Sequence, residues 1–195
     1  MGATTLNRTA TTDHPVLDVL AERWSPRAYD AENTIDEQKL ASALEAARWS
    51  PSAYNLQPWK FIVARRGTPE HAKVADALIE FNAAWAPAAA VLIVAVAVTA
   101  DADGREIPAA IYDLGQAVAH LSVQAHSDDL IVHQMTGFDP AAISASFALP
   151  DNERPFTVIA LGELGDIDAL PEAARERELA PRVRKPIADT LIVNA

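Results

Sequence analysis

A short loop near the start of the chain carries side chains that can hold an anion. Arg23 and Arg27 flank Ser25 in the segment Arg-Trp-Ser-Pro-Arg. Two guanidinium groups and a hydroxyl therefore lie within reach of one anionic ligand. The alternative is that both arginines are solvated on the surface, where isolated charges contribute little.

A second basic segment lies near the C-terminus of a chain whose formal net charge is −11. A cluster of positive charge on an acidic protein usually serves a purpose, such as binding an anion. A terminal phosphate is one candidate ligand, and the competing explanation is an ion-paired face against Glu172, Glu176 and Glu178. The basic residues are Arg175, Arg177, Arg182, Arg184 and Lys185.

A stiff polar loop is predicted just before a strand. Two prolines frame it, and asparagine and glutamine each offer a donor and an acceptor, as a heterocycle with alternating N–H and C=O edges requires. The alternative is an ordinary connection between a helix and a strand. Its sequence is Pro51-Ser52-Ala53-Tyr54-Asn55-Leu56-Gln57-Pro58-Trp59.

Several common motifs are absent. The 7 glycines allow neither G-x-G-x-x-G nor a P-loop, so any phosphate must be held by side chains and scattered amides. Neither G-x-S-x-G nor H-E-x-x-H occurs, and a chain with 0 cysteines has no thiolate nucleophile and no cysteine metal site. We predict no metal site, and we interpret His133 as a core or edge histidine and Asp139 as a helix cap.

The composition predicts one domain, residues 1–195, of which residues 1–12 are flexible. The chain is 50% hydrophobic, which suffices for one substantial core. Its acidity makes nucleic acid and acidic lipid headgroups poor partners. The first residues lack the apolar region of a secretion signal, and the absence of cysteine fits a reducing compartment, so we predict a cytoplasmic protein.

The uncharged segment of residues 83–100 is long enough to be considered a membrane span. Pro87 interrupts it, and Asp101 and Asp103 follow without a basic flank, so we predict no membrane association. The segment is instead predicted to contain the end of a helix, to about Ala86, and a fully buried strand over residues 91–98.

Periodicity predicts further strands over residues 59–65, 130–135 and 156–164. The apolar run of residues 191–193 also resembles a strand, and an apolar strand at a chain end must find a sheet edge, which can belong to another subunit.

Capping signals and apolar spacing predict the helices. A first helix starts near Asp13 or His14 and ends near Glu22, and the spacing of Thr34 and Glu37 predicts a capping box for the second, which ends at Ser50. Thr68 opens a third helix that contains Leu78 and Phe81, and a longer helix begins at Pro108. Shorter helices are predicted from Asp139 to about Leu149 and over residues 171–180.

Together these segments resemble the FMN-dependent nitroreductase family, from about His14 onward. The loop of residues 51–61 is the most specific match, and the others gain weight from their order and spacing. The matching segments are Arg23-x-Ser25-Pro26-Arg27 with Tyr29, Pro51-Ser52-Ala53-x-Asn55-x-Gln57-Pro58-Trp59-x-Phe61, Ala86-Pro87, Asp113-x-Gly115, Met135-x-Gly137-Phe138-Asp139 and Arg182-x-Arg184-Lys185-Pro186.

The resemblance implies an α+β fold, in which helices wrap a central, mostly antiparallel sheet. It also implies a homodimer in which the arm of residues 180–195 reaches the partner subunit, with FMN bound at the interface. The implied cofactor-binding residues are Arg23, Trp24, Ser25, Arg27, Pro51, Ser52, Ala53, Asn55, Gln57, Asn82, Gln134, Met135, Thr136, Gly137, Arg182 and Arg184.

The resemblance also implies a role for each group. Arg23, Ser25, Arg182 and Arg184 would hold the phosphate, and Arg27 would lie near the pyrimidine edge of the flavin. The loop of residues 51–57 would come from the partner subunit. Asn82 would contact the flavin, and residues 134–137 would offer backbone N–H groups near its N5 atom.

The sequence departs from the family pattern in three places. Trp24 replaces a residue that is usually smaller or basic. Ser127-Asp128-Asp129 stands where many members have a glycine, although aspartate can adopt the left-handed conformation. Only a short turn connects Val98 to Pro108, where larger members insert segments that cover the substrate, and this predicts an open pocket.

The implied function is an FMN-dependent NAD(P)H oxidoreductase. NADH or NADPH would reduce the flavin, and a small acceptor such as a nitroaromatic or a quinone would then take the electrons, with ping-pong kinetics. No side chain is required as an acid or base, and Arg27 would give electrostatic support. The alternatives are a flavin-binding or storage protein without turnover, and a relative with dehalogenase or flavin-cleaving activity.

Overall fold

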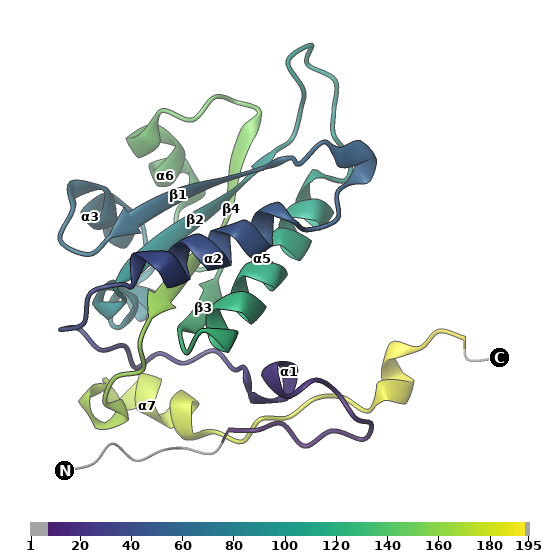
Figure 1. Cartoon of the computed structure of the whole chain (residues 1–195). Coiled ribbons are helices and arrows are strands. Elements are labelled where there is room, and N and C mark those ends of the chain that lie inside the picture. The colour runs from purple at the N-terminus through teal and green to yellow at the C-terminus, as the bar shows by residue number, and fades with distance from the viewer. Residues whose placement is uncertain (1–7, 194–195) are drawn as a thin grey trace.

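The computed structural model of the protein describes residues 8–193. A four-stranded sheet carries helices on both faces (Figure 1). All neighbouring strands are antiparallel, in the order β1-β2-β4-β3. This confirms the predicted α+β class. The strands are β1 (Trp59–Arg65), β2 (Val91–Val98), β3 (Ile131–Met135) and β4 (Glu153–Gly162).

Strand β2 lies in the interior of the sheet, and its alternate side chains enter two different cores. Val91, Ile93 and Ala95 face the helices α2 (Glu37–Arg48) and α5 (Ala110–Ser127). Leu92 and Val94 face the opposite layer. Because both faces are covered, the strand has no polar side, which confirms the predicted buried strand.

The second layer contains α3 (Pro69–Asp76), α4 (Glu80–Ala83) and α6 (Pro140–Phe147). Two predicted caps are confirmed here. The Thr68 side chain accepts a hydrogen bond from the His71 amide at the start of α3. The Asp139 side chain accepts from Ala141 and Ala142 at the start of α6.

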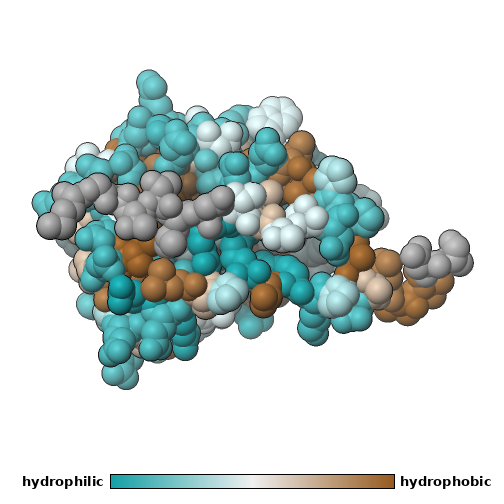
Figure 2. Space-filling view, turned by 90° about the horizontal axis from the view of Figure 1, so that it is seen from below, coloured by the Kyte–Doolittle hydropathy of each residue, from teal (hydrophilic) through white to brown (hydrophobic). Residues whose placement is uncertain are grey.

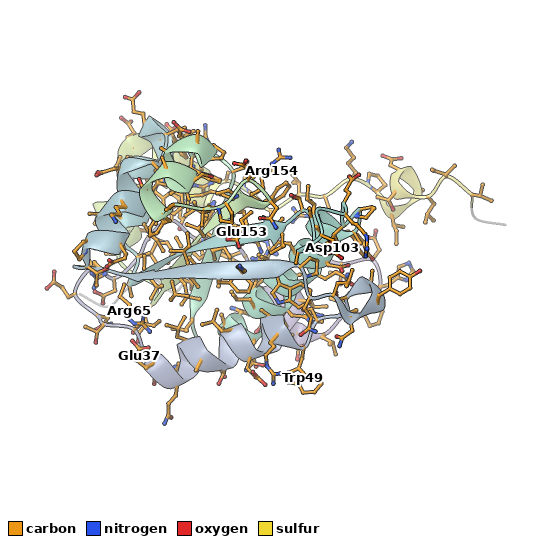
Figure 3. The ribbon with its side chains drawn as sticks, turned by 90° about the horizontal axis from the view of Figure 1, so that it is seen from above. Glu37, Trp49, Arg65, Asp103, Glu153 and Arg154 are labelled. Carbon is orange, nitrogen blue, oxygen red and sulfur yellow. The ribbon has the colours of Figure 1, made fainter. Side chains whose placement is uncertain are left out.

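The predicted capping box at the start of α2 is wrong. Asp36 is the cap, and its carboxylate accepts from Gln38 N at 2.8 Å and Lys39 N at 3.2 Å. Glu37 instead points to Arg65 on β1 (Figure 3), with Arg65 Nε 2.6 Å from Glu37 Oε1. Asp36, two residues closer to the helix than Thr34, satisfies the free N–H groups of the helix start directly.

Three other predicted boundaries also need correction. The first helix, α1 (Asp18–Glu22), begins later than expected, because residues 13–17 are exposed and have no apolar surface to support a further turn. The third ends before Leu78, which forms a bridge with Phe138, while Phe81 lies in α4. The long helix begins at Ala110, not Pro108.

Strand β4 begins at Glu153 rather than Phe156, because residues 153–155 pair with 96–98 of β2. At the end of α5, Asp129 has φ 62°, so the expected left-handed residue is an aspartate.

Single 3-10 turns lie at Ala53–Asn55, Ala86–Ala88, Ile167–Ala169 and Ile187–Thr190. None of the helices formed by residues 8–193 combines the length and hydrophobicity that crossing a bilayer requires.

The last helix, α7 (Glu172–Leu179), leads into an extended arm. The arm projects from the body of the molecule, with hydrophobic residues near its end (Figure 2). Residues 191–193 form no strand within the described chain, and strand pairing with a partner stays a prediction. The first seven residues of the segment predicted to be flexible, and residues 194–195 of the arm, lie outside the described part.

Candidate functional site

The two basic segments of the sequence meet in one pocket of about 220 Å³, which we call the arginine pocket. Six arginines line it, whereas the whole chain has only 16 lysines and arginines. No carboxylate is among the lining residues, all of which lie in the described part of the chain. The lining residues are Arg8, Arg23, Trp24, Ser25, Arg27, Arg177, Ala180, Pro181, Arg182 and Arg184.

Arg182 joins the C-terminal segment to the end of α1. Its guanidinium donates to the carbonyl oxygens of Ala21 at 2.8 Å and Arg23 at 2.9 Å, and also to that of Arg8. Arg8 in turn donates to Ala180 O at 2.8 Å. The guanidinium of Arg182 therefore donates mainly to backbone carbonyl oxygens and holds the pocket wall together.

Arg23 lies in the wall next to these contacts. Its Nη1 atom donates to Trp24 O at 2.7 Å and lies 3.4 Å from Ser25 Oγ. Burial lowers the pKa of Arg23, and the positive charges of Arg182 and Arg184 lower it further. Burial also lowers the pKa of Arg182, and the positive charges of Arg184 and Arg8 lower it further. A bound anion would relieve this concentration of positive charge.

Arg27 contacts a buried acid that the sequence pattern places only on a charged helix face. Glu178 on α7 is 0% exposed, and its Oε2 atom lies 3.4 Å from Arg27 Nη1. Its Oε1 atom accepts from the backbone amides of Arg27 at 2.8 Å and Ala28 at 3.3 Å. The only local signal was its position one helical turn after the buried Ala174.

An aromatic cluster lies beneath Arg27. The Arg27 guanidinium carbon is 6.0 Å from the ring centres of both Phe81 and Trp85. His133 packs at 4.6 Å from the Trp85 ring, and its Nδ1 atom is 2.9 Å from Pro26 O. Burial lowers the pKa of His133 to about 4 against the opposing effect of the Pro26 carbonyl, with a smaller contribution from Arg27. The histidine is thus neutral near pH 7, and its prediction as a core or edge residue is confirmed.

A second pocket of about 280 Å³, the β3 pocket, lies between β3 and α5. Gln134 donates from Nε2 to Ser122 Oγ at 2.8 Å, and Thr157 Oγ1 donates to Met135 O at 3.0 Å. Three of the predicted cofactor-binding residues, Gln134, Met135 and Thr136, line this pocket. The complete lining is Leu114, Gly115, Val118, Gln134, Met135, Thr136, Phe156 and Thr157.

Gly137 follows the β3 pocket and is tied to α4. Its carbonyl oxygen accepts from Asn82 Nδ2 at 2.9 Å and from Ile79 N at 3.2 Å. A Cβ atom at this position would lie 2.6 Å from Asn82 Nδ2, so only glycine permits this approach. The Gly137 N–H has no hydrogen-bond acceptor among residues 8–193. The Asn82 side chain therefore holds the backbone next to the pocket.

The loop of residues 51–57 lines neither pocket. Ser52 Oγ and Ala53 N both donate to Asp113 Oδ2 at 2.9 Å, which fixes the loop to the N-terminal part of α5. Asp113 matches the family pattern, but the sequence indicates no role for it. The loop also contains Tyr54, Asn55 and Gln57, which have positive φ angles of 52°, 56° and 51°. Such backbone strain persists only where surrounding contacts hold it.

The arginine pocket lies near the other end of α5. His126, in the last turn, has its pKa lowered first by burial and then by Arg23. At 1.5 Å per residue, about 20 Å of helix separates His126 from Asp113. Within one chain, the loop of residues 51–57 and the arginine pocket are therefore far apart.

A larger hollow of about 700 Å³ lies among α6, the start of α5 and the start of β4. Thr99, Glu106, Ile107 and Pro108, from the short connection after β2, form part of its wall. None of the predicted cofactor-binding residues lines it.

Comparisons with known proteins agree with the resemblance. The family model of the nitroreductase family matches residues 20–87. A crystal structure described as "the oxidoreductase containing FMN" is 31% identical to this chain and has a TM-score of 0.89. The alignment covers 97% of this chain and 96% of the chain in that structure.

Two further relatives match parts of the sequence. An "uncharacterized 15.4 kDa protein in ask 5'region" of Mycolicibacterium smegmatis is 41% identical over 132 residues, which are 64% of this chain and 88% of the relative. The "major NAD(P)H-flavin oxidoreductase" of Aliivibrio fischeri is 44% identical over 50 residues, 26% of this chain and 23% of the relative. With the family match and the similarity to an FMN-containing oxidoreductase along nearly the whole chain, the protein belongs to the nitroreductase family.

Proposed function

We propose that the protein is an FMN-dependent oxidoreductase that takes electrons from NADH or NADPH and passes them to a small organic acceptor. The arginine pocket is the observation that carries this proposal, because a chain with a net charge of −11 concentrates six arginines in one place. The FMN of the similar oxidoreductase and the name of the Aliivibrio fischeri relative support it.

The arginine pocket fits the phosphate end of FMN. Arg23, Ser25 and Arg184 offer charge and a hydroxyl, while Arg182 holds the wall together. Arg8 Nε is buried and has no hydrogen-bond acceptor among the described residues. Donors without acceptors are expected where a ligand supplies the oxygen atoms.

The β3 pocket fits the flavin ring. Its walls are mostly apolar, as a planar aromatic ligand requires. Gly137, whose N–H has no acceptor among the described residues, directly follows the lining residue Thr136. His133 and Gln134 are consecutive residues of β3, one beside Pro26 and the other beside α5. These consecutive side chains point to opposite faces of the sheet, and β3 is its edge strand, so a ligand that reaches both neighbourhoods would lie along this edge.

A homodimer would complete the site. The loop of residues 51–57 is about 20 Å of helix away from the arginine pocket of its own chain, so a second copy is the natural source of its contacts. The exposed arm of residues 180–193 gives that second copy a further surface to bind.

We also propose one domain over residues 1–195 and a cytoplasmic location.

Bound FMN would supply the hydride chemistry, and the protein would supply position and electrostatics. Arg27 would stabilise the negative charge that reduction places on the pyrimidine edge, and Gly137 would hold the ring through its N–H. No side chain is assigned as acid or base. The proposed acceptors are small molecules such as nitroaromatics or quinones, which would take electrons from the reduced flavin.

The first test is reconstitution of the flavin-free protein, followed by flavin fluorescence. We expect about one FMN per chain and much weaker binding of riboflavin, because the arginines would then have no phosphate to contact. Equal affinity for the two would contradict the phosphate site.

The second test is anaerobic reduction with NADH and NADPH, followed by a panel of acceptors. Rapid bleaching of the bound flavin and reoxidation by an acceptor would support turnover. A yellow protein that neither donor bleaches would favour flavin storage, and product analysis would identify a dehalogenase or a flavin-cleaving relative.

A further inference from the structure

We propose that Glu178 is a positioning residue that limits the positive charge Arg27 presents to the flavin and thereby lowers the flavin's redox potential. This inference rests on the proposed function and adds a residue on a different element, α7. The sequence motif that contains Arg27 gives no indication of it.

The geometry makes Glu178 specific to Arg27. The carboxylate is completely buried, and one oxygen faces Arg27 Nη1 at 3.4 Å. The other oxygen accepts from the amides of Arg27 and Ala28. Backbone and side chain of one arginine are thus held by a single acid from a segment 151 residues away.

Among the groups near Arg27, Glu178 supplies the negative charge that balances the arginine. His133 is neutral near pH 7, because burial lowers its pKa to about 4. Tyr29 is also neutral, since burial first and Glu178 second raise its pKa well above 10. Arg177, whose guanidinium carbon is 4.1 Å from the centre of the Phe81 ring, adds a second positive charge nearby. Glu178 is the only ion-pair partner of Arg27 among residues 8–193.

The consequence for the flavin follows from charge. Reduction makes the flavin more negative, so a nearby cation favours the reduced form and a nearby anion disfavours it. A buried carboxylate is screened little by salt, so it offsets part of the effect of Arg27. The pair presents a smaller charge than the arginine alone would.

Potentiometric titration of FMN-loaded Glu178→Gln and Glu178→Asp tests this, with Glu176→Gln as the control on the exposed face of the same helix. In Glu178→Gln we expect binding of reduced relative to oxidised flavin to strengthen about tenfold, which raises the midpoint potential by about 30 mV for two electrons. Glu178→Asp keeps the charge and should stay near the wild-type potential, as should Glu176→Gln. In an Arg27→Met background the effect of Glu178→Gln should shrink, because the carboxylate then has no arginine charge to offset.

An unchanged potential in FMN-bound Glu178→Gln would overturn the proposal, as would an equal shift in Glu178→Asp. If Glu178→Gln does not fold, Arg27→Met is compared with the double variant Arg27→Met, Glu178→Gln, and a full difference of about 30 mV between these two would overturn the proposal, because Glu178 would then act without Arg27. A wild-type protein that binds no FMN would instead refute the proposed function.

Discussion

The carboxylate of Asp113 accepts a hydrogen bond from the hydroxyl of Ser52 at 2.9 Å, and this contact fixes the loop of residues 51–57 to α5. The same oxygen accepts from the Ala53 amide. Asp113 is 2% exposed, so its charge is balanced by these donors rather than by bulk water.

We therefore expect Asp113→Ala to destabilise the protein by about 3–6 kcal/mol, since it removes two hydrogen bonds to a charged group, each of which contributes about 1.5–3 kcal/mol. Urea unfolding measures the change. Ser52→Ala is the matched control, because it keeps the Ala53 contact and should lose less. Equal stabilities of Asp113→Ala and wild type would show that the loop is held by other contacts.

Arg27 and Arg23 should affect the flavin differently. Loss of one preorganised donor costs roughly 2–4 kcal/mol, so Arg27→Ala should lower the flavin midpoint potential by about 40–90 mV, using about 30 mV per 1.4 kcal/mol. Arg23→Ala should weaken FMN binding with less effect on the potential, because a phosphate contact does not sense the redox state. Potentiometry of both variants decides the roles, and an unchanged potential in FMN-bound Arg27→Ala would refute the role given to Arg27.

The arm should be required for the dimer. Ile187 and Ile192 are 55% and 102% exposed, so they have apolar surface to bury on a second chain. We expect truncation after Ala180 to abolish both dimerisation and FMN binding, as followed by sedimentation and absorbance.

Truncation also removes Arg182 and Arg184, so the double variant Ile187→Ser, Ile192→Ser is the control that keeps them. It should weaken the dimer and leave the arginine pocket intact. A truncated protein that sediments as a yellow dimer would rule out this role for the arm.

His133 should make stability depend on pH. Its pKa is about 4 in the folded protein and near 6.5 when unfolded, so the unfolded chain binds the extra proton. The free energy of unfolding therefore keeps its full value above pH 6.5 and falls by about 3 kcal/mol in total as the pH falls toward 4. Denaturant unfolding of wild type and His133→Asn from pH 7.5 to 4 should show a smaller loss in the variant, whereas parallel curves would contradict this assignment.

Gly137→Ala should destabilise the protein. The added Cβ would lie 2.6 Å from both Asn82 Nδ2 and Ile79 Cδ1, and overpacking of this kind costs about 1–3 kcal/mol. Gly115→Ala is the matched control, because nothing lies within 4 Å of its Cβ position in α5, and it should be neutral or stabilising. Thermal unfolding that gives the same result for both variants would contradict the close approach at Gly137.

The sequence alone was sufficient for features that depend on neighbouring residues. The uncharged run of residues 91–98 predicted a strand buried on both faces, and the Thr68 and Asp139 caps were identified correctly, because periodicity and capping are local. The capping box failed because Glu37 has a partner on β1, which no local pattern specifies. The order of short motifs was enough to identify the family.

Only the tertiary structure decided how the charged residues are used. The sequence could not show that Arg182 holds the backbone of α1, that Arg8 joins the same pocket, or that Glu178 is buried against Arg27. Each of these depends on segments more than 150 residues apart coming together. Whether a charged side chain is solvated or buried is determined by what folds over it, and that information lies in long-range packing rather than in the residue's own surroundings in the sequence.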